Sequence, residues 1–127
     1  IIIFILANSL VNVWTPRSTY DGTLSIMDLE KISNLIVSDN PTGNYNITET
    51  MSGDARFVAL RYFLLRDAVV TPQSEESYTG LDRLYIVTKK GQRPLLSDRW
   101  EFGATPNLVV TNTFETANLE ILRYERQ

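Results

Sequence analysis

The sequence predicts a small α/β domain in which a mixed β-sheet carries flanking helices and closes with a C-terminal β-hairpin. Three observations support this fold class. Apolar residues recur at helical spacing between positions 26 and 36, an apolar run at 84–87 has the character of a strand, and two strand-like segments near the C-terminus are separated by three residues. A chain of 127 residues is sufficient for one domain with one hydrophobic core.

The first predicted helix begins after Ser25, which is a good N-cap residue. Asp28 follows three residues later, as an acidic capping box requires. The apolar stripe of this helix consists of Ile26, Leu29, Ile32, Leu35 and Ile36. Asp, Asn, Pro and Gly within 39–43 end the helix. The pattern predicts an amphipathic helix that packs on a sheet.

A short strand at 45–50 and a second helix at 54–68 are expected next. The second helix is apolar over a wide arc, so we expect it to be largely buried. This arc contains Phe57, Val58, Leu60, Tyr62, Phe63, Leu64 and Leu65. Asp54 in the first turn suits the positive end of the helix dipole. A helix, a strand and a helix in this order indicate a crossover unit with its helices on a sheet.

The remaining strands are expected in the C-terminal half of the chain. Residues 69–80 predict a short extended piece and a polar loop, and 83–90 is the clearest strand, suited to burial on both faces. One or two helical turns are expected at 95–103. Strands at 107–114 and 118–125 form an antiparallel hairpin, because only a three-residue connection separates them. Together, the predicted helices and strands form a two-layer or three-layer α/β domain.

Some core positions can also be predicted. Ile86 lies in the most apolar strand and should be fully buried, and Leu60 of the second helix should pack over it. Trp100, Phe102 and Tyr124 are interpreted as aromatic residues of the core or its edge.

The composition excludes several classes of site. The chain has no Cys and no His, which excludes disulfides, thiolate metal sites, Cys nucleophiles and a Ser-His-Asp triad. A net charge of −3 without a basic run argues against a nucleic-acid surface. The Asp residues are scattered, with no spacing that forces a carboxylate pair. We therefore expect no cofactor and no metal site.

The N-terminal segment is uncharged from position 1 to 16, and residues 1–14 are apolar except for two Asn and one Ser. Crossing a bilayer as a helix needs roughly 20 residues, so this run is too short to span alone. We interpret residues 1–16 as the end of a transmembrane helix, with Trp14 at the membrane interface and Pro16 ending the helix. A first core strand is the alternative. Residues 17–24 are predicted to form a linker, and residues 25–127 are predicted to form the soluble domain.

The loop before the second helix is the candidate binding site. Ser52, Gly53, Asp54 and Arg56 surround a helix N-terminus, where free backbone N–H groups can hold an anion. A plain turn with a capping Asp is the commoner arrangement, and the GxGxxG and P-loop patterns are absent. The residues 46–48, Asn-Ile-Thr, match the N-glycosylation pattern inside a predicted strand, so we interpret this match as chance.

Three stretches carry a resemblance to a known family: SIMDLEKISNLIVSDNPTGNYNI, LDRLYIVTKKG and SDRWEFGATPNLVVTNTFETANLEILRYE. They resemble the C-terminal extracytoplasmic domain of prokaryotic polytopic membrane glycosyltransferases of the GT-C type. These enzymes are akin to dolichyl-phosphate-mannose-protein mannosyltransferases and aminoarabinose transferases. The counterparts of the family's motifs are Ser25–Ile36, Leu84–Thr88, Trp100–Gly103 and Leu119–Glu125, although the Trp usual before the hairpin turn is absent.

The resemblance implies a parent enzyme that transfers a sugar from a polyprenyl-phosphate donor to an acceptor outside the cytoplasm. In that family the catalytic acid lies in an early extracytoplasmic loop between transmembrane helices, so no catalytic residue is implied here. The implied role is to cover the membrane-embedded active site or to contact the acceptor on the extracytoplasmic face. Its implied partners are the membrane and a glycan or lipid-linked sugar.

Two other functions are open to this sequence. A free-standing α/β binding or interaction domain without enzymatic activity is the main alternative. A small hydrolase that uses the Asp54 loop is disfavoured, because the chain has neither His nor Cys.

Overall fold

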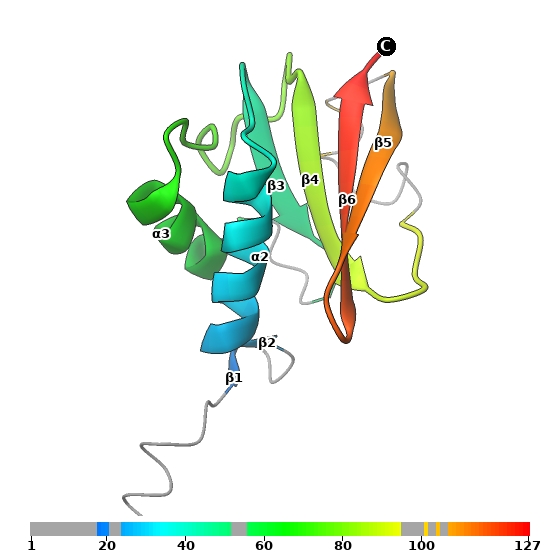
Figure 1. Ribbon diagram of the computed structural model, residues 1–127. Coiled ribbons are helices and arrows are strands. Elements are labelled where there is room, and N and C mark those ends of the chain that lie inside the picture. Colours follow the sequence, from blue (N-terminus) through cyan, green and yellow to red (C-terminus); the bar gives the residue numbers. More distant parts are fainter. Residues whose placement is uncertain (1–17, 21–23, 52–55, 95–100, 102–103, 105–106) are drawn as a thin grey trace, which may run out of the picture.

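A computed structural model describes residues 18–20, 24–51, 56–94, 101, 104 and 107–127. Its centre is a four-stranded sheet in the order β3-β4-β6-β5. The strands are β3 (Tyr45–Glu49), β4 (Arg83–Lys89), β5 (Leu108–Glu115) and β6 (Leu119–Arg126). Two helices, α2 (Ile26–Ser38) and α3 (Val58–Asp67), lie on one side of this sheet, with α3 beyond β3 (Figure 1).

The sheet is mixed, as the sequence predicts. Strands β3 and β4 are parallel, whereas β6 is antiparallel to both β4 and β5. The β5–β6 pair is the predicted C-terminal hairpin, and its register shifts between Val110 and Asn112. Residues 69–80 contain no strand, and of the turns expected at 95–103 only Glu101 lies within the described residues.

Helix α2 begins where its sequence predicts. The Ser25 side chain accepts a hydrogen bond from the backbone N–H of Asp28 at 3.1 Å, and the Asp28 carboxylate accepts one from the backbone N–H of Ser25 at 2.9 Å. These reciprocal bonds satisfy two donors that the first turn of a helix otherwise leaves unpaired. Leu29, Ile32 and Ile36 on one side of α2 are buried.

Helix α3 differs from the prediction in its start and in its burial. It begins at Val58 rather than 54, and Phe57 before it adopts a left-handed backbone with φ of 48°. The wide apolar arc is only partly buried, because α3 lies beyond the β3 edge of the sheet and packs against α2, so that only one face of it is covered (Figure 1). Tyr62 and Leu65 remain 65% and 62% exposed, whereas Arg61 is 8% exposed.

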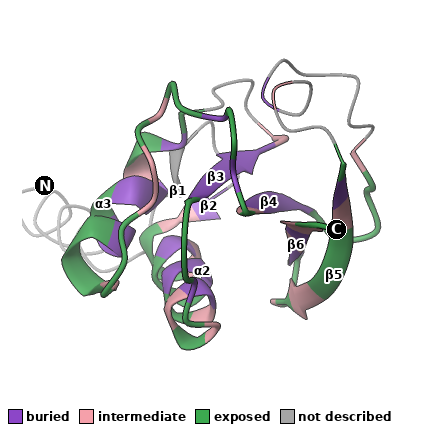
Figure 2. Ribbon diagram, turned by 90° about the horizontal axis from the view of Figure 1, so that it is seen from above, coloured by how far each residue is buried: buried purple, intermediate pink, exposed green. Residues whose placement is uncertain are grey.

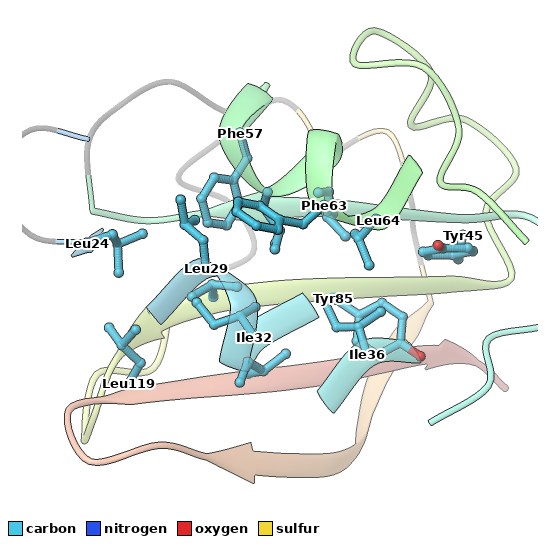
Figure 3. Close-up of a cluster of buried hydrophobic side chains, with 14 residues drawn as sticks. Leu24, Leu29, Ile32, Ile36, Tyr45, Phe57, Phe63, Leu64, Tyr85 and Leu119 are labelled. Atoms are coloured by element: carbon cyan, nitrogen blue, oxygen red, sulfur yellow. The ribbon is translucent and has the colours of Figure 1, made fainter. Parts of the chain in front are cut away.

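The core forms two clusters on opposite faces of the sheet, because neighbouring residues of a strand point to opposite faces. The larger cluster joins both helices to the sheet and includes Leu60 and Tyr85 (Figure 3). The smaller cluster includes Ile86 and Leu122. Ile86 is fully buried as expected, but the predicted packing of Leu60 over it is wrong, since the two residues belong to different faces.

The N-terminal part adds a two-stranded ribbon below the helices. Within the predicted linker, β1 (Ser18–Tyr20) pairs antiparallel with β2 (Leu24–Ser25), which leads directly into α2. The transmembrane interpretation concerns residues 1–16, which lie outside the described residues. Among the residues that the structure does describe, no helix is long and apolar enough to cross a membrane.

Candidate functional site

The loop that the sequence analysis proposed as a binding site is only partly described. Ser52, Gly53 and Asp54 lie outside the described residues, and Arg56 is exposed. The backbone carbonyl of Arg56 accepts a hydrogen bond from Nε of Arg61 at 2.5 Å. The prediction of an anion site at this loop stays a prediction.

A groove of about 400 Å³ lies between α2 and the turn of the β5–β6 hairpin. It is lined by Lys31, Asn34, Leu35, Ser38, Glu115, Thr116 and Ala117. The four helical residues follow the spacing that places side chains on one face of a helix. The opposite wall comes from the hairpin turn, so the groove depends on two elements that are far apart in the sequence.

The groove combines polar walls with an apolar strip. Asn34 and Ser38 supply an amide and a hydroxyl, both of which can donate and accept hydrogen bonds. The Thr116 hydroxyl accepts from the backbone N–H of Leu119 at 3.2 Å and keeps its own proton for a further bond. Leu35 is half-buried between them. Such a surface suits a neutral ligand that carries hydroxyl groups and one apolar face.

The groove carries three charges, two of which form an ion pair. Glu115 lies with its carboxylate 2.6 Å from Nζ of Lys90, and both side chains are about half exposed. This ion pair raises the pKa of Lys90, chiefly through the hydrogen bond to Glu115. Lys31 adds one positive charge on the helix side. The three side chains together leave a single positive charge in excess, so the groove has no cluster of like charges.

A second polar cluster joins the C-terminal end of α2 to the sheet. The Asp39 carboxylate accepts hydrogen bonds from Tyr85 Oη at 2.6 Å and Arg123 Nη1 at 2.7 Å, and Arg83 Nη1 lies 3.3 Å away. Arg83 also contacts Glu125, with Nη2 2.5 Å from its carboxylate. A hydrogen bond from Thr111, followed by the bonds from Arg83, lowers the pKa of Glu125. Because acids and bases pair within the cluster, it holds the helix on the sheet rather than presenting a free charge.

The third polar centre is the buried Arg61 of α3. Its guanidinium donates to the backbone carbonyl of Gln73 at 2.7 Å, to Oδ1 of Asn46 at 2.7 Å and to the Tyr78 hydroxyl at 3.2 Å. Burial lowers the pKa of Arg61, and the neighbouring Tyr78 opposes this shift. All of these acceptors are neutral groups, and the charge of the nearby Glu75 carboxylate also opposes the lowering of the pKa of Arg61.

Arg61 and its neighbours close the outer edge of β3. The outward carbonyl of Ile47 accepts from Tyr78 Oη at 2.8 Å and from Arg61 Nη2 at 3.3 Å, while that of Tyr45 accepts from the backbone N–H of Gln73 at 2.8 Å. An edge strand with unpaired backbone groups would invite pairing with another chain. The cluster therefore has a structural role in protecting the sheet.

The sequence analysis missed Arg61 as an important residue. A signal was present, because Arg61 stands between apolar residues in a helix that was expected to be buried. A charged residue at such a position needs hydrogen-bond partners inside the protein.

The glycosylation pattern at 46–48 is not accessible in the fold. Asn46 is fully buried, and its amide nitrogen donates to the backbone carbonyls of Ser74 at 3.0 Å and Ser77 at 2.8 Å. Its side chain therefore serves the β3 edge. Tyr124, which was interpreted as a core aromatic, is 5% exposed, whereas Trp100 and Phe102 lie outside the described residues.

No group of three or more acidic, His or Cys residues that could hold a metal ion occurs in the described part of the chain. Comparisons with protein families, with curated proteins and with solved structures find no match.

Proposed function

We propose that this chain is the extracytoplasmic accessory domain of a membrane glycosyltransferase that transfers a sugar from a polyprenyl-phosphate donor to an extracytoplasmic acceptor. In this proposal the domain itself is not catalytic. The observation that carries it is the order of the elements between Ile26 and Arg126. Helix, strand, helix, strand and closing hairpin follow one another as the family resemblance implies.

The positions of the resembling stretches add support. Ser25–Ile36 coincides with the start and body of α2, and Leu84–Thr88 lies within β4, which is an inner strand of the sheet. Leu119–Glu125 coincides with β6. Apart from the N-cap Ser25, each of these three stretches falls within a single helix or strand, and Trp100–Gly103 lies largely outside the described residues.

The groove between α2 and the hairpin is the surface that we assign to contact with the acceptor. A glycan offers many hydroxyl groups and apolar ring faces, which match the polar walls and the apolar strip of the groove. Asn34 and Ser38 would bond to hydroxyl groups, and Leu35 would contact a ring face. The groove has only one positive charge in excess and no cluster of like charges, so a ligand without a strong charge fits it best.

The non-catalytic role can be tested with the purified chain and a panel of polyprenyl-phosphate-linked sugars. We expect no transfer of sugar to glycan or peptide acceptors, because the family's catalytic acid belongs to a different part of the parent enzyme. Measurable transfer by the chain alone, lost on heat denaturation, would overturn the proposal of an accessory domain.

The binding role can be tested by nuclear magnetic resonance with short neutral oligosaccharides. We expect shifts of the backbone signals of Asn34, Ser38 and Thr116, and weaker binding after Asn34→Ala. Glu76→Ala, in an exposed loop, is the matched control. Shifts confined to other surfaces would show that the groove is not the glycan site.

A further inference from the structure

The outer face of α3 carries large apolar side chains that no part of the described chain covers. Val58 is 53% exposed, Tyr62 65% and Leu65 62%, and their spacing of four and three residues places them on one side of the helix. Val69, just after the helix, is 94% exposed. Single exposed apolar residues are normal, but a stripe of them marks an interaction surface.

A second pair of exposed apolar residues opens α2. Ile26 and Met27 are 48% and 51% exposed. Leu24, two residues before Ile26, belongs to the same core cluster as Phe57, which immediately precedes Val58 (Figure 3). Both helices are therefore preceded by a residue of this one cluster. We name the six residues Ile26, Met27, Val58, Tyr62, Leu65 and Val69 the outer apolar surface.

Near this surface Arg66 is attracted by two acidic residues, Asp67 and, on α2, Glu30. Arg66 lies with Nη2 2.6 Å from the Asp67 carboxylate, and its guanidinium also lies 5.0 Å from the centre of the Phe63 ring. A partner that binds the outer apolar surface would therefore gain little from a net charge of its own. Tyr62 adds a ring with a polar tip, which is favoured where apolar and aqueous phases meet.

We propose that the outer apolar surface lies on a lipid bilayer, at the level of the headgroups. The sequence gives a reason to choose this partner. Residues 1–14 are uncharged and end in a Trp, and the chain connects them to β1, which pairs with β2 directly before Ile26 (Figure 1). The inference rests on the proposed function, since that function attaches the domain to a membrane.

The chain has no Cys, which makes a site-specific test direct. Single Cys residues introduced as Tyr62→Cys and Leu65→Cys are labelled with an environment-sensitive fluorophore and mixed with phosphatidylcholine vesicles. The matched control is Val110→Cys, because Val110 is 41% exposed on β5, at the opposite edge of the sheet from α3. Figure 2 shows this separation of α3 and β5.

We expect emission at positions 62 and 65 to shift to the blue and to rise by at least about twofold, because the probe leaves water for the interface. Nitroxide-labelled lipid should quench both probes, and the probe at 110 should be unaffected. High salt should leave the signal unchanged, because the interaction is apolar.

Four outcomes would overturn the inference. The chain fails to bind the vesicles, or it binds while the probes at 62 and 65 remain in water, which would mean that another segment attaches it. Equal burial of the probes at 62, 65 and 110 would mean that the domain adsorbs to the vesicle in no fixed orientation. Burial of the probe at 65 that needs no vesicles and grows with protein concentration would mean that a second copy covers the surface. None of these results decides the proposed function, which the gene sequence tests separately.

Discussion

At the scale of single residues, the Arg61 guanidinium connects α3 to three separate pieces of chain: β3, the backbone at Gln73 and Tyr78. Replacing it with an apolar residue would remove the donor to the backbone carbonyl of Gln73 and to the Tyr78 hydroxyl. Each such group costs about 1–3 kcal/mol. A Lys at this position could not reproduce the planar fork of donors.

We therefore predict that Arg61→Met lowers the free energy of unfolding by more than about 3 kcal/mol. Urea denaturation of the two chains measures the difference. Arg66→Met is the matched control, because Arg66 is exposed on the same helix and should change stability little. Equal effects of the two substitutions would contradict the structural role of Arg61.

A second residue-scale prediction concerns pH. Burial raises the pKa of Tyr45 to about 12, although the charge of Arg61 opposes the shift. A raised pKa means that the folded state keeps the phenolic proton more tightly than the unfolded state. The contribution of Tyr45 to stability is therefore complete below pH 10 and is lost as the pH rises from 10 towards 12.

Denaturation at several alkaline pH values tests this directly. We expect the free energy of unfolding of Tyr45→Phe to fall less steeply between pH 10 and 12 than that of the native chain. Tyr62→Phe serves as the control, because Tyr62 is exposed on α3. Parallel slopes for Tyr45→Phe and the native chain would mean that the Tyr45 hydroxyl is not buried in the folded protein.

At the scale of elements, the start of α2 depends on its capping box. Ser25→Ala removes the side-chain acceptor for the Asp28 N–H and should lower the free energy of unfolding by about 1 kcal/mol. Thermal or urea denaturation measures this loss. Ser38→Ala at the other end of the helix is the control and should stay within about 0.5 kcal/mol of the native value. A loss after Ser38→Ala as large as that after Ser25→Ala would argue against the cap.

The two helices show why sequence predicts some elements better than others. The start of α2 is encoded by Ser25 and Asp28, which are three residues apart, so local chemistry was sufficient. The start and exposed face of α3 depend on how the helix lies against β3. Apolar residues such as Tyr62 and Leu65 stay exposed there while Arg61 is buried, because the edge of β3 needs donors. No local pattern contains that information.

The groove could not be predicted for the same reason. Its walls come from α2 and from the hairpin turn at Glu115, some eighty residues later in the chain. Asn34 and Ser38 both lie on the exposed side of α2, but only the register of the sheet places the hairpin beside them. The predicted loop site at 52–56 used local signals alone.

At the scale of the whole molecule, the sheet separates two cores that should act independently. Leu60 and Ile86 are both fully buried but belong to different clusters. Leu60→Ala should cost about 2–5 kcal/mol and Ile86→Val about 0.5–1.5 kcal/mol. The two residues share no cluster. The free energy of unfolding of the double variant should therefore fall by the sum of the two single losses, within about 0.5 kcal/mol.

Urea denaturation of the two single variants and the double variant completes this cycle. Glu76→Ala, in an exposed loop, is the control and should change stability by less than about 0.5 kcal/mol. A coupling energy well above the expected error would place Leu60 and Ile86 in one core and contradict the two-sided sheet.

The proposal that this domain belongs to a membrane glycosyltransferase can be tested with the nucleotide sequence of the gene upstream of the Ile1 codon. We expect a continuous reading frame that encodes several apolar segments of roughly 20 residues each, with an acidic residue in an early loop between them. A start codon close to Ile1 with no such segments before it would contradict the claim and favour a free-standing binding domain.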